Sequence, residues 1–206
     1  MIFRDQLSKQ NIYWKYVKYE TVNEYLKGLD EIRQAGCTII GAVCDGKKGL
    51  MQSIKGIPVQ MCQFHQVAIV TRYLTRTPQL EPAIELKKIT ALLVRTDKES
   101  FTGILDQWKN NWSDFLKEKT HNVQTGKWQY KHRKLRSAIR SLTVNLPYLY
   151  TSYDNPKLEI PNTNNSVEGV ISNLKKKVAP HNGLKLERKM KLINQILAKN
   201  QQRNVQ

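Results

Sequence analysis

Apolar and polar residues follow one another along the N-terminal part of the chain in a way that predicts two strands and a helix. Residues 1–4 look like the end of a strand, and residues 11–19 carry aromatic or β-branched residues at alternate positions. The polar segment between them predicts a long hairpin loop. Apolar residues then recur at helical spacing behind Thr21, which forms a capping box with Glu24, and the helix is expected to end at Gly36.

Two short apolar runs follow this helix. Residues 38–44 are continuously apolar, which is typical of a strand buried on both faces in a parallel sheet. The run stops at Asp45 and Gly46, a short helix is expected over residues 48–54, and residues 57–62 predict another strand. The order strand, strand, helix, strand, helix, strand is an α/β pattern.

From about residue 63 the spacing of apolar residues becomes helical. Several prolines and many Asn and Thr residues predict a loop over residues 143–164, and the polar residues 200–206 are expected to fray. The expected helices cover residues 67–74, 86–93, 101–115, 135–142, 165–177 and 186–199.

The composition excludes several classes of protein. With 206 residues, 40% of them hydrophobic and 25% charged, the chain can build a core. No apolar run approaches the roughly 20 residues that span a bilayer, and the first ten residues lack the apolar stretch of a secretory signal. Cys37, Cys44 and Cys62 are too few for a disulfide framework, so we expect a cytoplasmic protein.

The net charge of +17 indicates a polyanionic partner such as nucleic acid, against the simpler interpretation of a solvated basic surface. The charge is uneven, because residues 120–206 hold 16 Lys or Arg and only 4 Asp or Glu. Trp128 and Tyr130 lie among these cations, and we expect them to be core residues rather than platforms for bases. The candidate DNA-binding residues are Lys131, Arg133, Lys134, Arg136, Arg140, Lys175, Lys176, Lys177, Lys185, Arg188 and Lys189.

Two carboxylates stand out as candidate metal ligands. Asp45 ends the predicted parallel strand, and ligands of open α/β sheets gather at that end of the strands, although Asp-Gly is also a common turn dipeptide. Glu168 follows an Asn-rich segment and opens a predicted helix. It is either a metal ligand on the first turn or the second half of a capping box with Asn165 as N-cap.

Cys62 and His65 form a C-x-x-H motif, which is half of a zinc site. No obvious second half follows in the sequence. A structural or site-lining role is therefore the preferred interpretation.

Taken together, these segments resemble the catalytic domain of bacterial insertion-sequence transposases of the Mutator-like superfamily. The resemblance rests on the apolar strand ending in Asp45-Gly46, on the sequence VQMCQFH over residues 59–65, and on NNSVEG over residues 164–169. It extends to the basic segment LKKKVAPHNG, which follows the Glu168 helix.

The resemblance implies an α/β fold with an RNase H-like (retroviral-integrase-like) catalytic core, interrupted by an all-helical insertion. It also implies a DDE triad that holds Mg²⁺ or Mn²⁺ for DNA strand cleavage and transfer in transposition. Asp45 would be its second carboxylate and Glu168 its third, while Cys62 and His65 match the C-x-x-H motif of the family. Double-stranded DNA of the mobile-element ends and of the target, a homo-oligomer and a place at the bacterial nucleoid are implied in the same way. The expected parts are core residues 1–62, a mainly helical insertion over 63–161, core helices over 162–199 and a tail over 200–206.

One departure from the family pattern changes the expectation. The first catalytic Asp belongs on a first strand at the centre of the sheet, beside the second and fourth strands, and this strand has no counterpart here. Asp5 lies in the turn after the expected second strand, which is the wrong place. We therefore expect a truncated transposase that binds metal weakly or not at all and is inactive alone.

Three alternatives stay open. The chain could be a non-catalytic DNA-binding relic or repressor of a mobile element. It could be another RNase H-like nuclease in which Asp5 supplies the missing carboxylate from a shifted position, or a basic helical module whose motifs match by chance.

Overall fold

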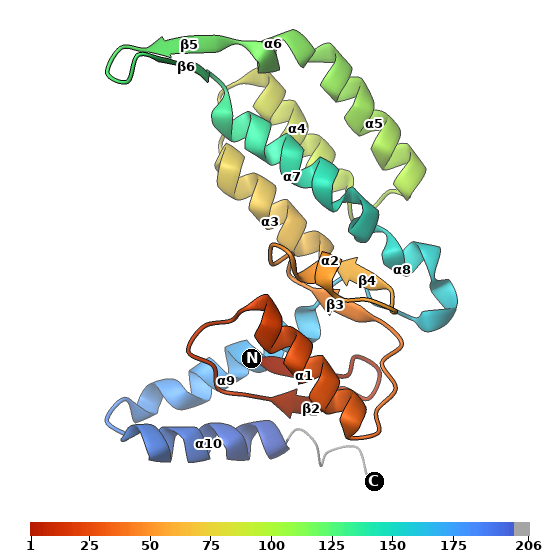
Figure 1. The fold of residues 1–206 in the computed structure, drawn as a ribbon, viewed down its shortest axis with the longest axis vertical. Coiled ribbons are helices and arrows are strands. Elements are labelled where there is room, and N and C mark those ends of the chain that lie inside the picture. The colour runs from red at the N-terminus through yellow and green to blue at the C-terminus, as the bar shows by residue number, and fades with distance from the viewer. Residues whose placement is uncertain (200–206) are drawn as a thin grey trace. The chain divides into compact units, whose positions relative to one another are not determined.

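A computed structural model describes residues 1–199, and the expected tail over residues 200–206 lies outside the described residues. The fold is mixed α/β, as predicted, with about 58% helix and small sheets (Figure 1). The strands are β1 (Ile2–Arg4), β2 (Asn11–Trp14), β3 (Ala42–Cys44), β4 (Val59–Met61), β5 (Lys119–Asn122) and β6 (Lys127–Tyr130). The α-helices are α1 (Val22–Gln34), α2 (Leu50–Ser53), α3 (Gln63–Leu74), α4 (Glu81–Leu92), α5 (Lys98–Asn111), α6 (Ser113–Lys117), α7 (Arg133–Leu149), α8 (Thr151–Asp154), α9 (Asn165–Val178) and α10 (Leu186–Lys199). Two 3₁₀ helices, η1 (Pro156–Leu158) and η2 (Ala179–His181), complete the described elements.

The strands pair two by two. β1 and β2 are antiparallel, with Phe3 opposite Tyr13, and β3 and β4 are parallel, with Cys44 opposite Met61. Within residues 1–199, no ladder joins the β1–β2 pair to the β3–β4 pair. Each pair therefore keeps two strand edges without a sheet neighbour in the described chain.

Strand β3, the first of the parallel pair, is shorter and less buried than the sequence of residues 38–44 predicts. Only Ala42–Cys44 are in strand conformation, and Ile40 is 48% exposed. The expectation of burial on both faces was wrong here, because a strand with one neighbour lacks the flanking strand that would help to cover it.

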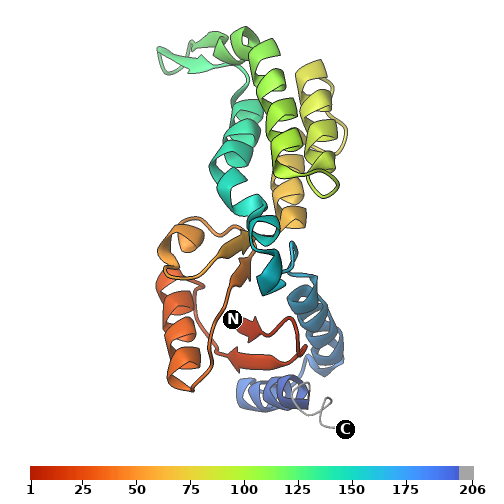
Figure 2. The same cartoon turned by 90° about the vertical axis from the view of Figure 1, so that its right-hand side faces the viewer.

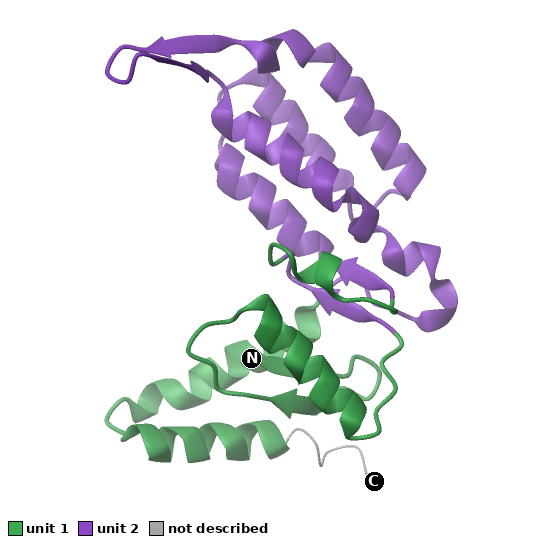
Figure 3. Ribbon diagram, viewed as in Figure 1, with its two compact units in different colours: residues 1–40, 47–57, 164–206 green, residues 41–46, 58–163 purple. Residues whose placement is uncertain are grey.

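The chain forms two compact units, drawn in different colours in Figure 3. Unit 1 comprises residues 1–40 and 47–57 and the described part of 164–206, and unit 2 comprises residues 41–46 and 58–163. Unit 1 therefore holds β1, β2, α1, α2, α9 and α10, and unit 2 holds the remaining strands and the helices α3 to α8.

Unit 1 packs α1 and α9 around the β1–β2 hairpin (Figure 2). Phe3 contacts the rings of Tyr13 and Tyr25 edge-on, at 5.7 and 6.1 Å between ring centroids. Gly28 lets α1 approach closely, because a Cβ there would lie 2.6 Å from the Phe3 ring. Arg4 Nε donates to Ser166 Oγ on α9 at 2.7 Å. Segments more than 160 residues apart in sequence thus share one small core.

The first helix forms as its sequence predicts. Thr21 Oγ1 accepts a hydrogen bond from the Glu24 backbone amide at 3.2 Å, which confirms Thr21 as the N-cap. Gly36 follows the last turn with φ +86°, a left-handed conformation that favours glycine.

Unit 2 is a helical core built onto the β3–β4 pair. Most of its largest fully buried side chains are aromatic or aliphatic: Met61, Leu86, Leu93, Phe101, Leu105, Leu142, Leu149 and Tyr150. Three fully buried glutamines tie this core together. Gln60 and Gln63 both donate to the Leu149 carbonyl oxygen at 2.9 Å, and Gln66 Nε2 donates to Ser141 Oγ at 3.2 Å. These bonds satisfy polar groups whose burial would otherwise destabilise the fold.

Two predictions for the helical part were wrong. The expected loop over residues 143–164 is partly helical, because α7 continues through Pro147 to Leu149 and α8 follows it. The complete burial of Leu149 and Tyr150 offsets the hydrogen bond that Pro147 cannot make near the end of α7. The insertion was also expected to be all-helical, yet it contains the β5–β6 hairpin, so the helical pattern is interrupted between α6 and α7.

Candidate functional site

Asp45 is exposed and directly follows the parallel strand β3. Gly46, the next residue, has φ +85°, and a Cβ at that position would overlap the side chain of Met61. Glycine is therefore required by the turn itself. The turn interpretation explains Gly46, whereas the carboxylate of Asp45 stays on the surface at the strand end, where a ligand can reach it.

Cys44 precedes Asp45 in the sequence but does not share its candidate role as a metal ligand. Burial raises the pKa of the Cys44 thiol to about 12, the Gly46 backbone amide opposes this, and the Asp45 carboxylate and Cys62 add to it. Because the thiolate is the nucleophile and the metal ligand, a raised pKa disfavours both roles for Cys44.

Cys62 and His65 come together at the start of α3. Cys62 is the N-cap residue and is fully buried, and its backbone amide donates to the Cys44 carbonyl oxygen at 2.8 Å. His65 lies in the first turn and is half-buried, with a ring nitrogen within 4.8 Å of the Cys62 sulfur. The C-x-x-H motif is thus a local pair of donors in unit 2, near the strand that ends at Asp45.

Glu168 lies in the first turn of α9, in unit 1, and is exposed. The N-cap is Asn164 rather than the expected Asn165, and its side chain makes no capping hydrogen bond. The capping-box interpretation of Glu168 was therefore wrong, since Glu168 stands one position too far along the helix. A negative charge in the first turn still suits the positive end of the helix dipole.

The candidate DNA-binding residues form one group in each unit. In unit 2, Arg133, Lys134 and Arg140 are exposed on α7. Lys131 and Arg136 already have internal partners: Lys131 Nζ lies 3.0 Å from a Glu118 carboxylate oxygen, and Arg136 Nη1 donates to the Leu116 carbonyl oxygen at 2.7 Å. In unit 1, all but one of the candidates are exposed and Lys189 is half-buried: Lys175, Lys176, Lys177, Lys185, Arg188 and Lys189.

Trp128 and Tyr130 are not core residues, contrary to the prediction. Trp128 is 69% exposed and Tyr130 is 38% exposed on β6. The sequence did contain a signal for this hairpin: two short runs with alternating β-prone residues flank Asn122 and Gly126, the turn residues that such a loop favours.

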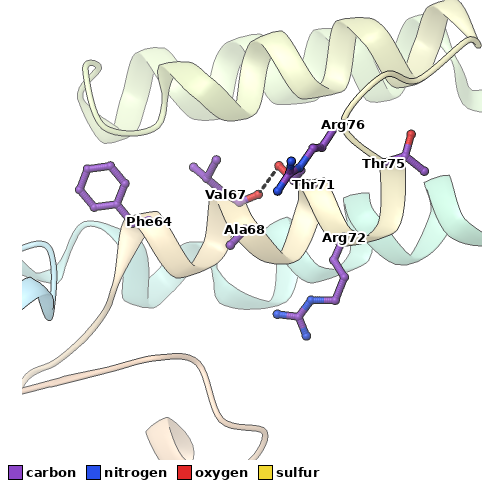
Figure 4. A pocket seen from close by; sticks show the side chains of 7 residues that line it. All are labelled: Phe64, Val67, Ala68, Thr71, Arg72, Thr75 and Arg76. Carbon is purple, nitrogen blue, oxygen red and sulfur yellow. Dashed lines mark hydrogen bonds between the residues drawn. The ribbon is translucent and has the colours of Figure 1, made fainter. Parts of the chain in front are cut away.

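An open depression runs along one face of α3 (Figure 4). Thr71, one of its lining residues, donates from Oγ1 to the Val67 carbonyl oxygen at 2.9 Å, so its hydroxyl serves the helix itself. Small-molecule sites are usually enclosed and bury most of the ligand, which an open helix face does not offer. The residues that line the depression are Phe64, Val67, Ala68, Thr71, Arg72, Thr75 and Arg76.

Comparisons with protein-family models, with curated proteins and with solved structures find no match to this chain. Among the helices of residues 1–199, none combines the length and the apolar character needed to cross a membrane.

Proposed function

We propose that this chain is part of a DDE-type transposase with an RNase H-like core, acting in metal-dependent cleavage and transfer of DNA strands. The strand pairing is the observation that supports this most. An RNase H-like sheet lacking its first, central strand would leave an antiparallel pair and a separate parallel pair, and β1–β2 and β3–β4 have these two arrangements.

The donor chemistry of the two carboxylates suits the proposed metal. Mg²⁺ and Mn²⁺ prefer carboxylate oxygens, and Asp45 and Glu168 both present exposed carboxylates. The sulfur of Cys62 is buried and suits softer metals, so we assign it no magnesium role. When bound, two such ions would activate the attacking hydroxyl and stabilise the leaving oxygen of the phosphodiester.

The protein side chains have two tasks in this proposal. Asp45 and Glu168 offset the positive charge of the metal, and the exposed cations of α7, α9 and α10 hold DNA phosphates in place. The proposed partners are double-stranded DNA of the element ends and target, and a second copy of the chain. With only two of three carboxylates, we expect weak metal affinity and no strand cleavage by the chain alone.

A Mn²⁺ titration followed by electron paramagnetic resonance tests the metal assignment, because bound Mn²⁺ loses the sharp signal of the free ion. Weak binding is expected for the wild type and less for Asp45→Asn or Glu168→Gln. Asp30→Asn is the matched control, since Asp30 is an exposed carboxylate already paired with Arg33 at 3.0 Å. Equal binding by all four proteins, or Mn²⁺-dependent cutting of terminal-repeat DNA by the chain alone, contradicts the proposal.

A non-catalytic DNA-binding protein is the second candidate, and the exposed basic groups of both units favour it. Its DNA affinity would fall steeply with salt and would be unchanged by Asp45→Ala and Glu168→Ala. The alternative in which Asp5 supplies a metal ligand is less favoured. Both carboxylate oxygens of Asp5 accept backbone hydrogen bonds, from Leu7 at 3.2 Å and Ser8 at 2.9 Å, and so serve the turn after β1.

A further inference from the structure

The β5–β6 hairpin carries aromatic and basic side chains on one of its faces. Lys119 pairs with Tyr130 and His121 with Trp128 across the two strands. Paired residues share a face, and residues two apart along a strand share it too. Lys119, His121, Trp128 and Tyr130 therefore form one surface, which we call the ribbon face.

Neighbouring side chains hold the two aromatic rings of the ribbon face in place. The Arg136 guanidinium lies 3.5 Å from the centre of the Tyr130 ring, and Lys119 Nζ lies 5.5 Å from it. His121 meets Trp128 edge-on, at 5.4 Å between ring centroids. Two cations and an imidazole thus order both rings before any partner arrives, which lowers the entropy lost on binding.

The exposure of Trp128 is unusual for its residue type. At 69% exposed it contrasts with Trp108, which is 2% exposed in the helical core of the same unit. Tryptophan is highly buried on average, and leaving its large apolar surface in water is unfavourable. Figure 1 shows β5 and β6 extending away from the helices of their unit.

The electrostatic surroundings select the kind of partner. Residues 119–140 contain seven Lys or Arg and no Asp or Glu. Glu118, the acidic residue that directly precedes this segment in sequence, is already bound to Lys131 and His132, each at 3.0 Å. A surface that combines an exposed aromatic ring with uncompensated cations fits a ligand that has flat rings and negative charges.

We propose that the ribbon face binds unpaired nucleic-acid bases, with Trp128 stacking on a base and Lys119 holding a flanking phosphate. Stacking on an aromatic side chain needs a base whose face is free, as in a single strand, whereas the bases of a duplex already stack on each other. The inference shares a nucleic-acid partner with the proposed function but needs neither metal nor cleavage.

The test is fluorescence anisotropy of a labelled 20-nucleotide oligo(dT) with the full chain, in EDTA and at fixed salt. Trp128→Ala is expected to weaken binding about tenfold or more, and Trp128→Phe is expected to retain most of it. Tyr19→Ala is the matched control, because Tyr19 is 70% exposed and has Lys18 Nζ 5.6 Å from its ring centre. Circular dichroism verifies that each variant is folded, and the ring is too exposed for its loss to unfold the chain.

A blunt duplex of the same length separates stacking from general attraction to phosphates. Trp128→Ala is expected to change duplex affinity less than about twofold, since lysines alone hold phosphates. Unchanged oligo(dT) affinity in Trp128→Ala, or an equal loss on the duplex, overturns the inference. Because the assay is run in EDTA and the Mn²⁺ titration needs no nucleic acid, the failure of this inference and the failure of the proposed function are separate outcomes.

Discussion

Replacing Gly46 with alanine tests how the turn after β3 is built. Gly46 has φ +85°, and an alanine held in a left-handed conformation costs about 1–2 kcal/mol. The added Cβ would also overlap the end of the Met61 side chain, which is fully buried and would have to shift within the core. Overpacking of this kind costs about 1–3 kcal/mol. Gly46→Ala is therefore expected to destabilise unit 2 by about 2–5 kcal/mol.

Gly126→Ala provides the matched control in the same unit. Gly126 has φ +65°, but a Cβ there has nothing within 4 Å, so only the backbone term of about 1–2 kcal/mol applies. The difference between the two variants measures the steric contact with Met61 alone.

Urea unfolding followed by circular dichroism gives both free energies of unfolding. A double-mutant cycle with Met61→Ala adds a direct measurement of the contact: the steric part of the Gly46→Ala cost is expected to disappear when the Met61 side chain is shortened. Equal destabilisation by Gly46→Ala and Gly126→Ala, together with strict additivity in the cycle, would refute the reasoning.

Three further predictions concern other parts of the chain. Thr21→Ala removes the N-cap bond of α1 and is expected to cost about 1 kcal/mol in urea unfolding; an unchanged midpoint contradicts it. Leu142→Ala leaves a cavity where the side chain is fully buried and is expected to cost about 2–5 kcal/mol, whereas Val144→Ala, at a residue 52% exposed on the same helix, is expected to cost under about 0.5 kcal/mol. Partial burial raises the pKa of Asp5, but hydrogen bonds from the Ser8 hydroxyl and from nearby backbone amides outweigh it and hold the pKa below its ordinary value of 3.8. The folded state then gains stability above that value and loses it as the pH falls through the lower folded-state pKa. Asp5→Asn is expected to flatten the fall in urea midpoint between pH 5 and pH 2, and an identical fall in both proteins would contradict this.

Local signals predicted the parts of the fold that depend on neighbours in sequence. Thr21 with Glu24 and the left-handed Gly36 determine the two ends of α1 through contacts within a few residues, so the sequence identified both. Pro147 favoured a loop for the same local reason, yet the burial of Leu149 and Tyr150 by distant helices keeps that segment helical. Tertiary packing outweighs local preference where a segment is fully buried.

For the candidate site, too, the sequence predicted what depends on local pattern and missed what depends on packing. The strand that ends at Asp45 and the Cys62–His65 pair at a helix start follow from local pattern. The one-residue shift of the α9 N-cap to Asn164 and the requirement for glycine beside Met61 do not, because they depend on how the chain packs. Trp128 was misjudged because its residue type, rather than the alternation of its hairpin, guided the interpretation.

The division of unit 1 along the sequence has a consequence for synthesis on the ribosome. Its strand β2 is bonded to the last helix, α10: Asn11 Nδ2 donates to the Leu197 carbonyl oxygen at 3.1 Å, and Trp14 Nε1 donates to Asn194 Oδ1 at 3.0 Å. The hairpin and α1 therefore cannot complete their packing until α9 and α10 have been synthesised. Unit 2, by contrast, is complete in sequence at residue 163. Nascent chains released early would hold a folded helical unit and an incomplete N-terminal one, whose apolar strands would be exposed to chaperones and proteases.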